Sequence, residues 1–176
     1  MTQKVASWKR ETDSRGSSIT AFILLLASSI AMAQNPDFEN RCHEEVVELH
    51  KVIEGWFAGT LPDTDSAFLE FSDAMADDFE IISPTGSLSD RNAIIGSLRT
   101  AYGVQESAFS IAIKNIRTRL LIPPLALLTY EEWQFENGHE TARLSTVLLR
   151  EDPGAPRGIS WVHLQETWLP GKSPNE

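Results

Sequence analysis

The sequence has only one cysteine and few basic residues, and each shortage excludes a class of protein. Cys42 has no second cysteine to pair with, so neither an intramolecular disulfide framework nor a cysteine-based zinc cluster is possible. The 15 Lys and Arg residues are outnumbered by 25 Asp and Glu, which gives a formal net charge of −10. A nucleic-acid partner is not expected, because phosphate backbones are bound by basic patches. The 176 residues, 41% of them hydrophobic, suit one ordinary globular domain.

A long hydrophobic run is also absent. The longest, residues 19–33, holds 15 uncharged, mostly apolar residues, whereas a membrane-spanning helix needs about 20. Basic residues precede it, and it ends in Ala31-Met32-Ala33, a small-x-small cleavage pattern. These are the parts of a signal peptide, so we expect residues 1–33 to be cleaved and residues 34–176 to form a secreted or periplasmic domain. Retention of residues 1–33 as an anchor is the alternative, and no other membrane contact is expected.

The spacing of apolar residues predicts three helices in the first half of this domain. The first, between Pro36 and Gly59, carries an apolar stripe at intervals of three and four residues, made of Phe38, Cys42, Val46, Leu49, Ile53 and Trp56. A second helix is predicted over residues 65–76 after a Thr64 cap, and a third over about residues 90–102. Residues 34–90 hold 14 acids and two bases, which we interpret mainly as the solvated faces of the first two helices.

The second half alternates between apolar and polar residues, which is typical of strands. Strands are predicted over residues 79–83, as a short strand in the first half before the third helix, and over residues 109–121, 125–136, 139–150 and 159–169. Asn137-Gly138 is a strong hairpin signal between the third and fourth of them. Helices followed by long strands predict an α+β fold, with three N-terminal helices packed on a strongly curved, mainly antiparallel sheet.

A two-residue turn at Asn137-Gly138 fixes the register of this hairpin, with Glu132 opposite Arg143. One side of the hairpin carries Leu127, Thr129, Glu131 and Trp133, and the other carries Tyr130, Glu132 and Gln134. Because the first side is the more apolar, we expect it to face the helices. The second side would then face outward, with Glu132 and Arg143 forming a weak cross-strand ion pair.

Several short strings resemble the nuclear transport factor 2-like superfamily, in particular its SnoaL-like and domain-of-unknown-function branches. They are residues 76–79 (ADDF), 82–86 (ISPTG), Asp90-Arg91 and 161–167 (WVHLQET), and the resemblance covers about residues 38–169. It implies a cystatin-like α+β cone, a pocket between the helices and the sheet, and dimerisation through the outer sheet face. It does not settle the function, because one fold hosts many functions.

This chain lacks the functional residues of two kinds of member of the superfamily. Ketosteroid isomerase-like members have an aspartate where this chain has Ser83 and a tyrosine at about Val52, so steroid isomerisation is not expected. The association domain of calcium/calmodulin-dependent kinase has two histidines on its last strand. His163 matches the first, but Gln165 replaces the second and Glu166 replaces the following arginine, so the anion binding of that pocket is not implied here.

The face assignment predicts a site. Glu131 and Glu166 would point into the pocket as a catalytic acid/base pair, with a ligand held by Trp56, Trp133, Thr146 and Trp168. The outer face would form a homodimer through Tyr130, Glu132, Arg143 and His163. Cys42, on the apolar stripe, is interpreted as a buried small side chain. No motif indicates a metal or an organic cofactor.

Three functions are compatible with these features. The first is an exported, homodimeric domain that binds a small, largely apolar molecule. The second is a SnoaL-like lyase, isomerase or cyclase that moves a proton through Glu131 and Glu166. The third is a non-catalytic assembly module whose interior is filled by its own side chains. The size of the cavity distinguishes the third from the other two.

Overall fold

The computed structural model describes residues 36–105 and 109–174, so the predicted signal segment and its cleavage site lie outside the described residues. The elements are α1 (Pro36–Phe57), α2 (Asp65–Ser72), β1 (Met75–Ile82), β2 (Leu88–Asp90), α3 (Arg91–Thr100), β3 (Ser110–Ile122), β4 (Leu125–Glu136), β5 (His139–Glu151) and β6 (Ile159–Trp168). Within the described ranges, no helix is both long and apolar enough to cross a membrane.

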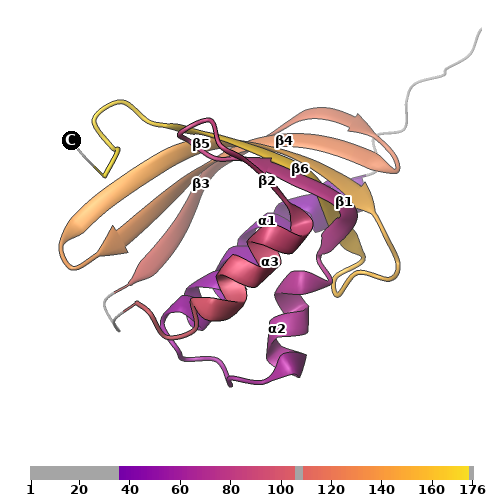
Figure 1. The fold of residues 1–176 in the computed structure, drawn as a ribbon. Helices are drawn as coiled ribbons and strands as arrows, with labels where there is room; N and C mark the ends of the chain where they lie inside the picture. The colour runs from indigo at the N-terminus through magenta and orange to yellow at the C-terminus, as the bar shows by residue number, and fades with distance from the viewer. Residues whose placement is uncertain (1–35, 106–108, 175–176) are drawn as a thin grey trace, which may run out of the picture. The chain divides into compact units, whose positions relative to one another are not determined.

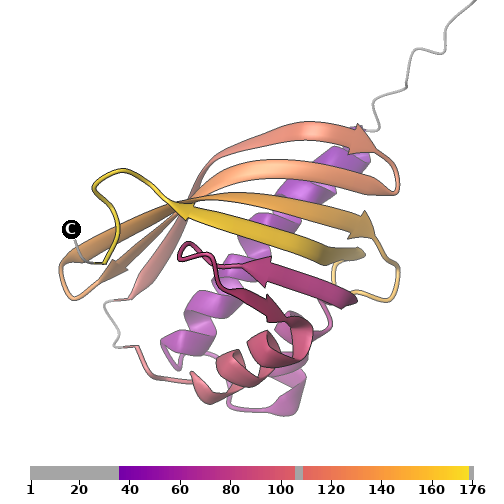
Figure 2. The ribbon, with the colours of Figure 1, turned by 45° about the horizontal axis from the view of Figure 1, so that its top comes forward.

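The six strands form one curved sheet in the order β2-β1-β6-β5-β4-β3. All neighbouring strands are antiparallel except β1 and β6, which are parallel. Figures 1 and 2 show the three helices together on one face of this sheet. The predicted α+β architecture, with three helices on a curved sheet, is therefore confirmed.

The core lies between α1 and the middle strands. Five of the six residues of the predicted stripe on α1 are at most 2% exposed, and they pack against buried side chains of β4, β5 and β6 such as Leu128, Val147 and Trp161. Cys42 belongs to this core, and burial raises the pKa of its thiol to about 12. The thiol stays protonated at neutral pH, as expected for a cysteine that serves as a small apolar side chain.

Hydrogen bonds attach α1 to the sheet near the middle of the helix and to α3 near its C-terminal end. The Glu45 carboxylate, 1% exposed, accepts bonds from Arg157 Nε (2.6 Å) in the β5–β6 loop and from Trp161 Nε1 (2.9 Å) on β6. Three turns later, Trp56 Nε1 donates to the Leu98 carbonyl on α3 (2.7 Å). These bonds hold α1 in place over the sheet.

The second helix is shorter than predicted. α2 begins after the Thr64 cap as expected but ends at Ser72, and Met75 already belongs to β1. The Ala74 carbonyl accepts a bond from the Trp161 amide (2.8 Å), and Met75 pairs with Trp161. Pairing with β6 therefore replaces the helix from this point, although the apolar residues keep a helical spacing. The short strand β2 was not predicted; it pairs with β1 just before Asp90 caps α3.

The hairpin of β4 and β5 has the predicted register, with Glu132 opposite Arg143, but the predicted face is wrong. The side that carries Tyr130 (0% exposed) and Glu132 (4%) faces the helices, whereas Leu144 on the other side is 42% exposed. The reason is that charged groups on the inner side neutralise one another. Counting apolar residues therefore selected the wrong side of the hairpin.

Candidate functional site

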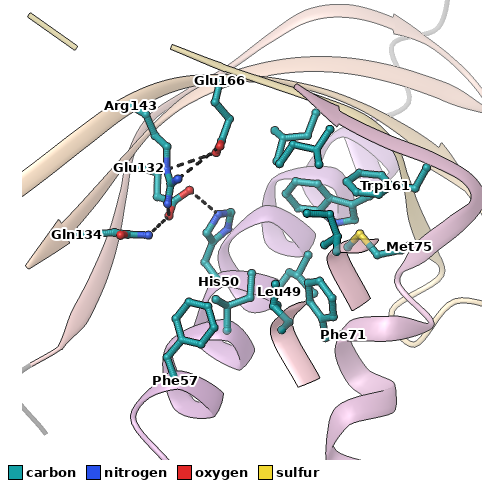
Figure 3. A pocket seen from close by; sticks show the side chains of 16 residues that line it. Leu49, His50, Phe57, Phe71, Met75, Glu132, Gln134, Arg143, Trp161 and Glu166 are labelled. Atoms are coloured by element: carbon teal, nitrogen blue, oxygen red, sulfur yellow. Dashed lines mark hydrogen bonds and ion pairs between the residues drawn. The ribbon is translucent and has the colours of Figure 1, made fainter. Parts of the chain in front are cut away.

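A cavity of about 330 Å³ lies between the helices and the inner face of the sheet. Eleven apolar side chains line it: Leu49, Ile53, Phe57, Phe71, Met75, Phe79, Ile81, Ile94, Leu98, Trp161 and Leu164. The polar lining is His50, Glu132, Gln134, Arg143 and Glu166. Figure 3 shows the polar side chains pointing toward one another, apart from apolar ones such as Phe71 and Met75. The cavity thus combines an apolar body with one charged end.

Glu132 is the most tightly held group of the charged end. Its Oε1 accepts hydrogen bonds from Arg143 Nη2 (2.6 Å) and Gln134 Nε2 (2.8 Å), and its Oε2 lies 3.2 Å from His50 Nε2. Burial disfavours the ionised form, but the positive charges of Arg143 and His50 outweigh it and hold the pKa of Glu132 well below its usual value. Glu132 is therefore a carboxylate over the ordinary pH range.

His50 projects from α1 onto this carboxylate. Its Nδ1 lies 2.6 Å from the Val46 carbonyl, which only accepts, so Nδ1 carries a hydrogen. Ionised Glu132 also only accepts, so Nε2 carries a hydrogen as well. Burial works against a charged ring, but Glu132 reverses that effect and raises the pKa of His50. The ring is an imidazolium that donates from both nitrogens.

Glu166 on β6 is held much more loosely by the same arginine. Arg143 Nε is 3.3 Å from Oε1, Arg143 Nη1 is 3.4 Å from Oε2, and the Ser145 hydroxyl is 3.5 Å from Oε1. Burial raises the pKa of Glu166 to about 7, with the charge of Glu132 acting in the same direction and Arg143 against it. The two carboxyl groups share one guanidinium, yet only Glu166 changes its protonation state near neutral pH.

The structure places the two predicted catalytic residues on opposite faces of the sheet. Glu166 points into the cavity, as expected. Glu131 is on the outer face, where it accepts bonds from Asn115 Nδ2 (2.9 Å) and Trp133 Nε1 (3.0 Å). The expected pairing of Glu131 with Glu166 is therefore wrong, and the second carboxyl group that lines the cavity with Glu166 is Glu132.

None of the four predicted ligand-binding residues lines the cavity. Trp133 lies on the outer face, where the ammonium groups of Lys114 and Lys172 are 4.0 and 5.1 Å from its ring centroid. Thr146 shares that face, and Trp56 is buried in the core. Trp168 is nearest to the site, because its ring centroid is 5.9 Å from the Arg143 guanidinium carbon.

The expected dimer residues are also divided between the two faces. His163, opposite Leu148, is on the outer face as predicted. Tyr130, Glu132 and Arg143 are on the inner face, where Tyr130 contacts the His50 ring edge-on at 5.4 Å. Sequence reasoning thus missed His50, Glu132 and Arg143 as site residues. The available signal was the predicted Glu132–Arg143 pair, together with His50 four residues after Val46 on the stripe of α1.

Within residues 36–105 and 109–174, no group of three or more His, Cys, Asp or Glu side chains is arranged to hold a metal ion.

Residues 42–170 match the family model described as sucrose-6-phosphate phosphohydrolase C-terminal. The chain belongs to this family.

This member of the sucrose-6-phosphate phosphohydrolase C-terminal family is also similar to proteins whose structures have been solved. An NTF-2 like protein of unknown function from Pseudomonas aeruginosa is 28% identical, with a TM-score of 0.67, and the match covers 73% of this chain and 98% of that one. The CaMKII hub of S. rosetta is 12% identical (TM-score 0.54; coverage 72% and 95%). A protein of unknown function with a cystatin-like fold from Nostoc punctiforme is also 12% identical (TM-score 0.53; coverage 76% and 95%). These similarities confirm the nuclear transport factor 2-like fold.

Proposed function

We propose that this domain is exported and binds a small, largely apolar molecule in the cavity, with the polar end of that molecule against Arg143 and Glu166. The observation that carries the proposal is the cavity itself. Its volume of about 330 Å³ lies within the range of small-molecule sites, and eleven of its sixteen lining residues are apolar. An unfilled interior of this size argues against a purely structural module. A sugar phosphate fits poorly, because it needs polar partners along its whole length.

Identification of a bound molecule tests this proposal directly. The exported protein is purified and denatured, and released small molecules are identified by mass spectrometry. In parallel, binding of 1-octanol is measured by calorimetry for the native protein and for Ile94→Trp, which fills the cavity from α3. Leu69→Trp on the exposed surface of α2 is the matched control. We expect octanol binding to be lost only in Ile94→Trp; equal binding by both folded variants would contradict the proposal.

One observation favours a second candidate, proton transfer by a lyase, isomerase or cyclase. Glu166, with a pKa of about 7, lies in an apolar cavity beside a carboxylate that stays ionised, which is how a general base is prepared. The test is incubation of the identified ligand with the protein in D₂O. Deuterium incorporation by the native protein and not by Glu166→Gln supports catalysis, whereas no incorporation leaves the domain as a binding protein.

We also propose that two copies pair through the outer sheet face. The register of β3, β4 and β5 puts a set of exposed apolar residues on this face: Leu120, Ile122, Leu125 and Leu144. Burial of such residues against a second copy removes them from water. The strands β3, β4 and β5, which carry this set, hold five acids and five bases, so long-range repulsion between two copies of this part of the sheet is small.

A further inference from the structure

The most accessible group at the charged end of the cavity is the cation. The Arg143 side chain is 20% exposed, whereas Glu132 and Glu166 are each 5% exposed and His50 is 6% exposed. A molecule that enters this end therefore meets a guanidinium before it meets a carboxylate. Such a group favours a ligand with a negatively charged, planar end.

Arg143 binds the two carboxyl groups at different distances, with Glu132 closer than Glu166. Glu132 accepts a bond of 2.6 Å from Nη2, within the range of strong charge-assisted bonds. The contacts of Glu166 with Nε and Nη1 are 3.3 and 3.4 Å, longer than bonds of that kind. Glu166 is thus the partner that an incoming anion can replace on the guanidinium.

The charges also limit what the cavity accepts. The charged groups facing Glu166 are Arg143 on β5, Glu132 on β4 and His50 on α1, with Ser145 as a polar neighbour; β1 and α3 line the cavity with apolar side chains only. With Glu166 ionised, these charges sum to zero. An anion alone or a cation alone would leave a net charge in an apolar cavity, which is costly. An anion that arrives with a proton for Glu166 keeps the sum at zero.

We infer that the ligand is a monocarboxylic acid with an apolar chain: its carboxylate replaces Glu166 on Arg143, and Glu166 takes up one proton from solvent. This inference rests on the proposed binding function and names its ligand class. The proton comes from water or buffer and forms an O–H bond on Glu166, and no other covalent bond is made or broken. At about 30 Å³ for each water-sized group, 330 Å³ holds about eleven such groups, so octanoate is a suitable probe.

Calorimetry with octanoate and with 1-octanol tests the inference on the native protein. Titrations at pH 6 and pH 8, each in two buffers of different ionisation enthalpy, give affinity and proton uptake together. We expect octanoate at pH 8 to bind with uptake of close to one proton, and to bind about tenfold more tightly at pH 6, because Glu166 is already protonated there. Octanol binding should be independent of pH.

A pair of matched variants assigns the proton. Glu166→Gln imitates the protonated side chain, so it should bind octanoate without proton uptake and, at pH 8, about tenfold more tightly than the native protein. Glu131→Gln, on the other face of the sheet, should behave as the native protein does. Octanol binding without octanoate binding, or octanoate binding without proton uptake, overturns the inference but not the proposed function. Failure of both probes to bind overturns both.

Discussion

Glu166 and Glu131 lie on the same sheet, but the pKa of Glu166 is raised and the pKa of Glu131 is lowered relative to an ordinary glutamate. At Glu166, burial and the charge of Glu132 disfavour the carboxylate and raise its pKa to about 7. At Glu131, which is half-buried on the outer face, hydrogen bonds from Trp133 and Asn115 favour the carboxylate and lower its pKa. The folded state therefore holds a proton at Glu166 more tightly than the unfolded chain does, and holds one at Glu131 less tightly.

Replacement of Glu166 by Gln should stabilise the protein at alkaline pH. The raised pKa means that the stability contributed by protonated Glu166 is fully present below about pH 4.5 and is lost as the pH rises through about 7. Gln cannot ionise, so we expect Glu166→Gln to exceed the native protein by on the order of 3 kcal/mol at pH 8 and by little at pH 4.5. Urea denaturation at both pH values measures the difference.

Glu131→Gln is a control in which the expected change in stability at alkaline pH has the opposite sign. Its lowered pKa stabilises the folded protein above the usual carboxyl pKa, and this contribution is lost as the pH falls through the lowered value. We expect the variant to be slightly less stable than the native protein at pH 8 and equal to it in acid. A gain in stability at pH 8 for Glu131→Gln, or none for Glu166→Gln, would reverse the assignment of the two faces.

The residue-level part of the site was only partly predictable. Glu166 was assigned to the pocket because it lies three positions from His163, which was assigned to the outer face, and successive side chains of a strand alternate between faces. His50 was missed, because its significance depends on a carboxylate 82 positions later that the sequence places on either side of a hairpin. The periodicity of α1 shows which helical face is buried, but it does not show which polar side chain opposes that face.

At the scale of elements, α1 depends on the charged contact between Glu45 and Arg157. Arg157→Met should leave the Glu45 carboxylate buried with only the Trp161 indole as a partner, and should lower the free energy of unfolding by about 3 kcal/mol. Arg150→Met is the matched control, because the Arg150–Asp78 pair is largely exposed and should be worth less than about 1 kcal/mol. Thermal or urea unfolding distinguishes them; equal losses would show that the Glu45 contact is not special.

The elements themselves were mostly predictable from turn residues and from the spacing of apolar side chains. The Asn137-Gly138 turn fixed the register of β4 and β5, because a two-residue loop leaves only one pairing. The face of the hairpin was not predictable from polarity, since Glu132 and Arg143 compensate each other when buried. The end of α2 was missed because Met75 continues the helical spacing, while β6 offers the backbone a stronger partner at that point.

At the scale of the whole molecule, the outer sheet face should decide the oligomeric state. Leu144→Glu puts a charge among the exposed apolar residues of this face, so we expect sedimentation velocity to show a dimer for the native protein and a monomer for the variant. Leu69→Glu, on the exposed surface of α2, should remain dimeric. A native protein that is monomeric at micromolar concentration, or a dimeric Leu144→Glu, would contradict pairing through this face.

The two attachments of α1 also have a consequence for how the cavity responds to a ligand. His50 lies between Glu45, bound to the β5–β6 loop, and Trp56, bound to α3, at about 7.5 and 9 Å along the helix. A helix fixed on both sides of a residue can neither slide nor rotate much at that residue. The charged end is therefore preorganised: most of the entropy lost in ordering it is lost during folding, so binding loses little more. Ligands should associate without a slow conformational step, in a single kinetic phase.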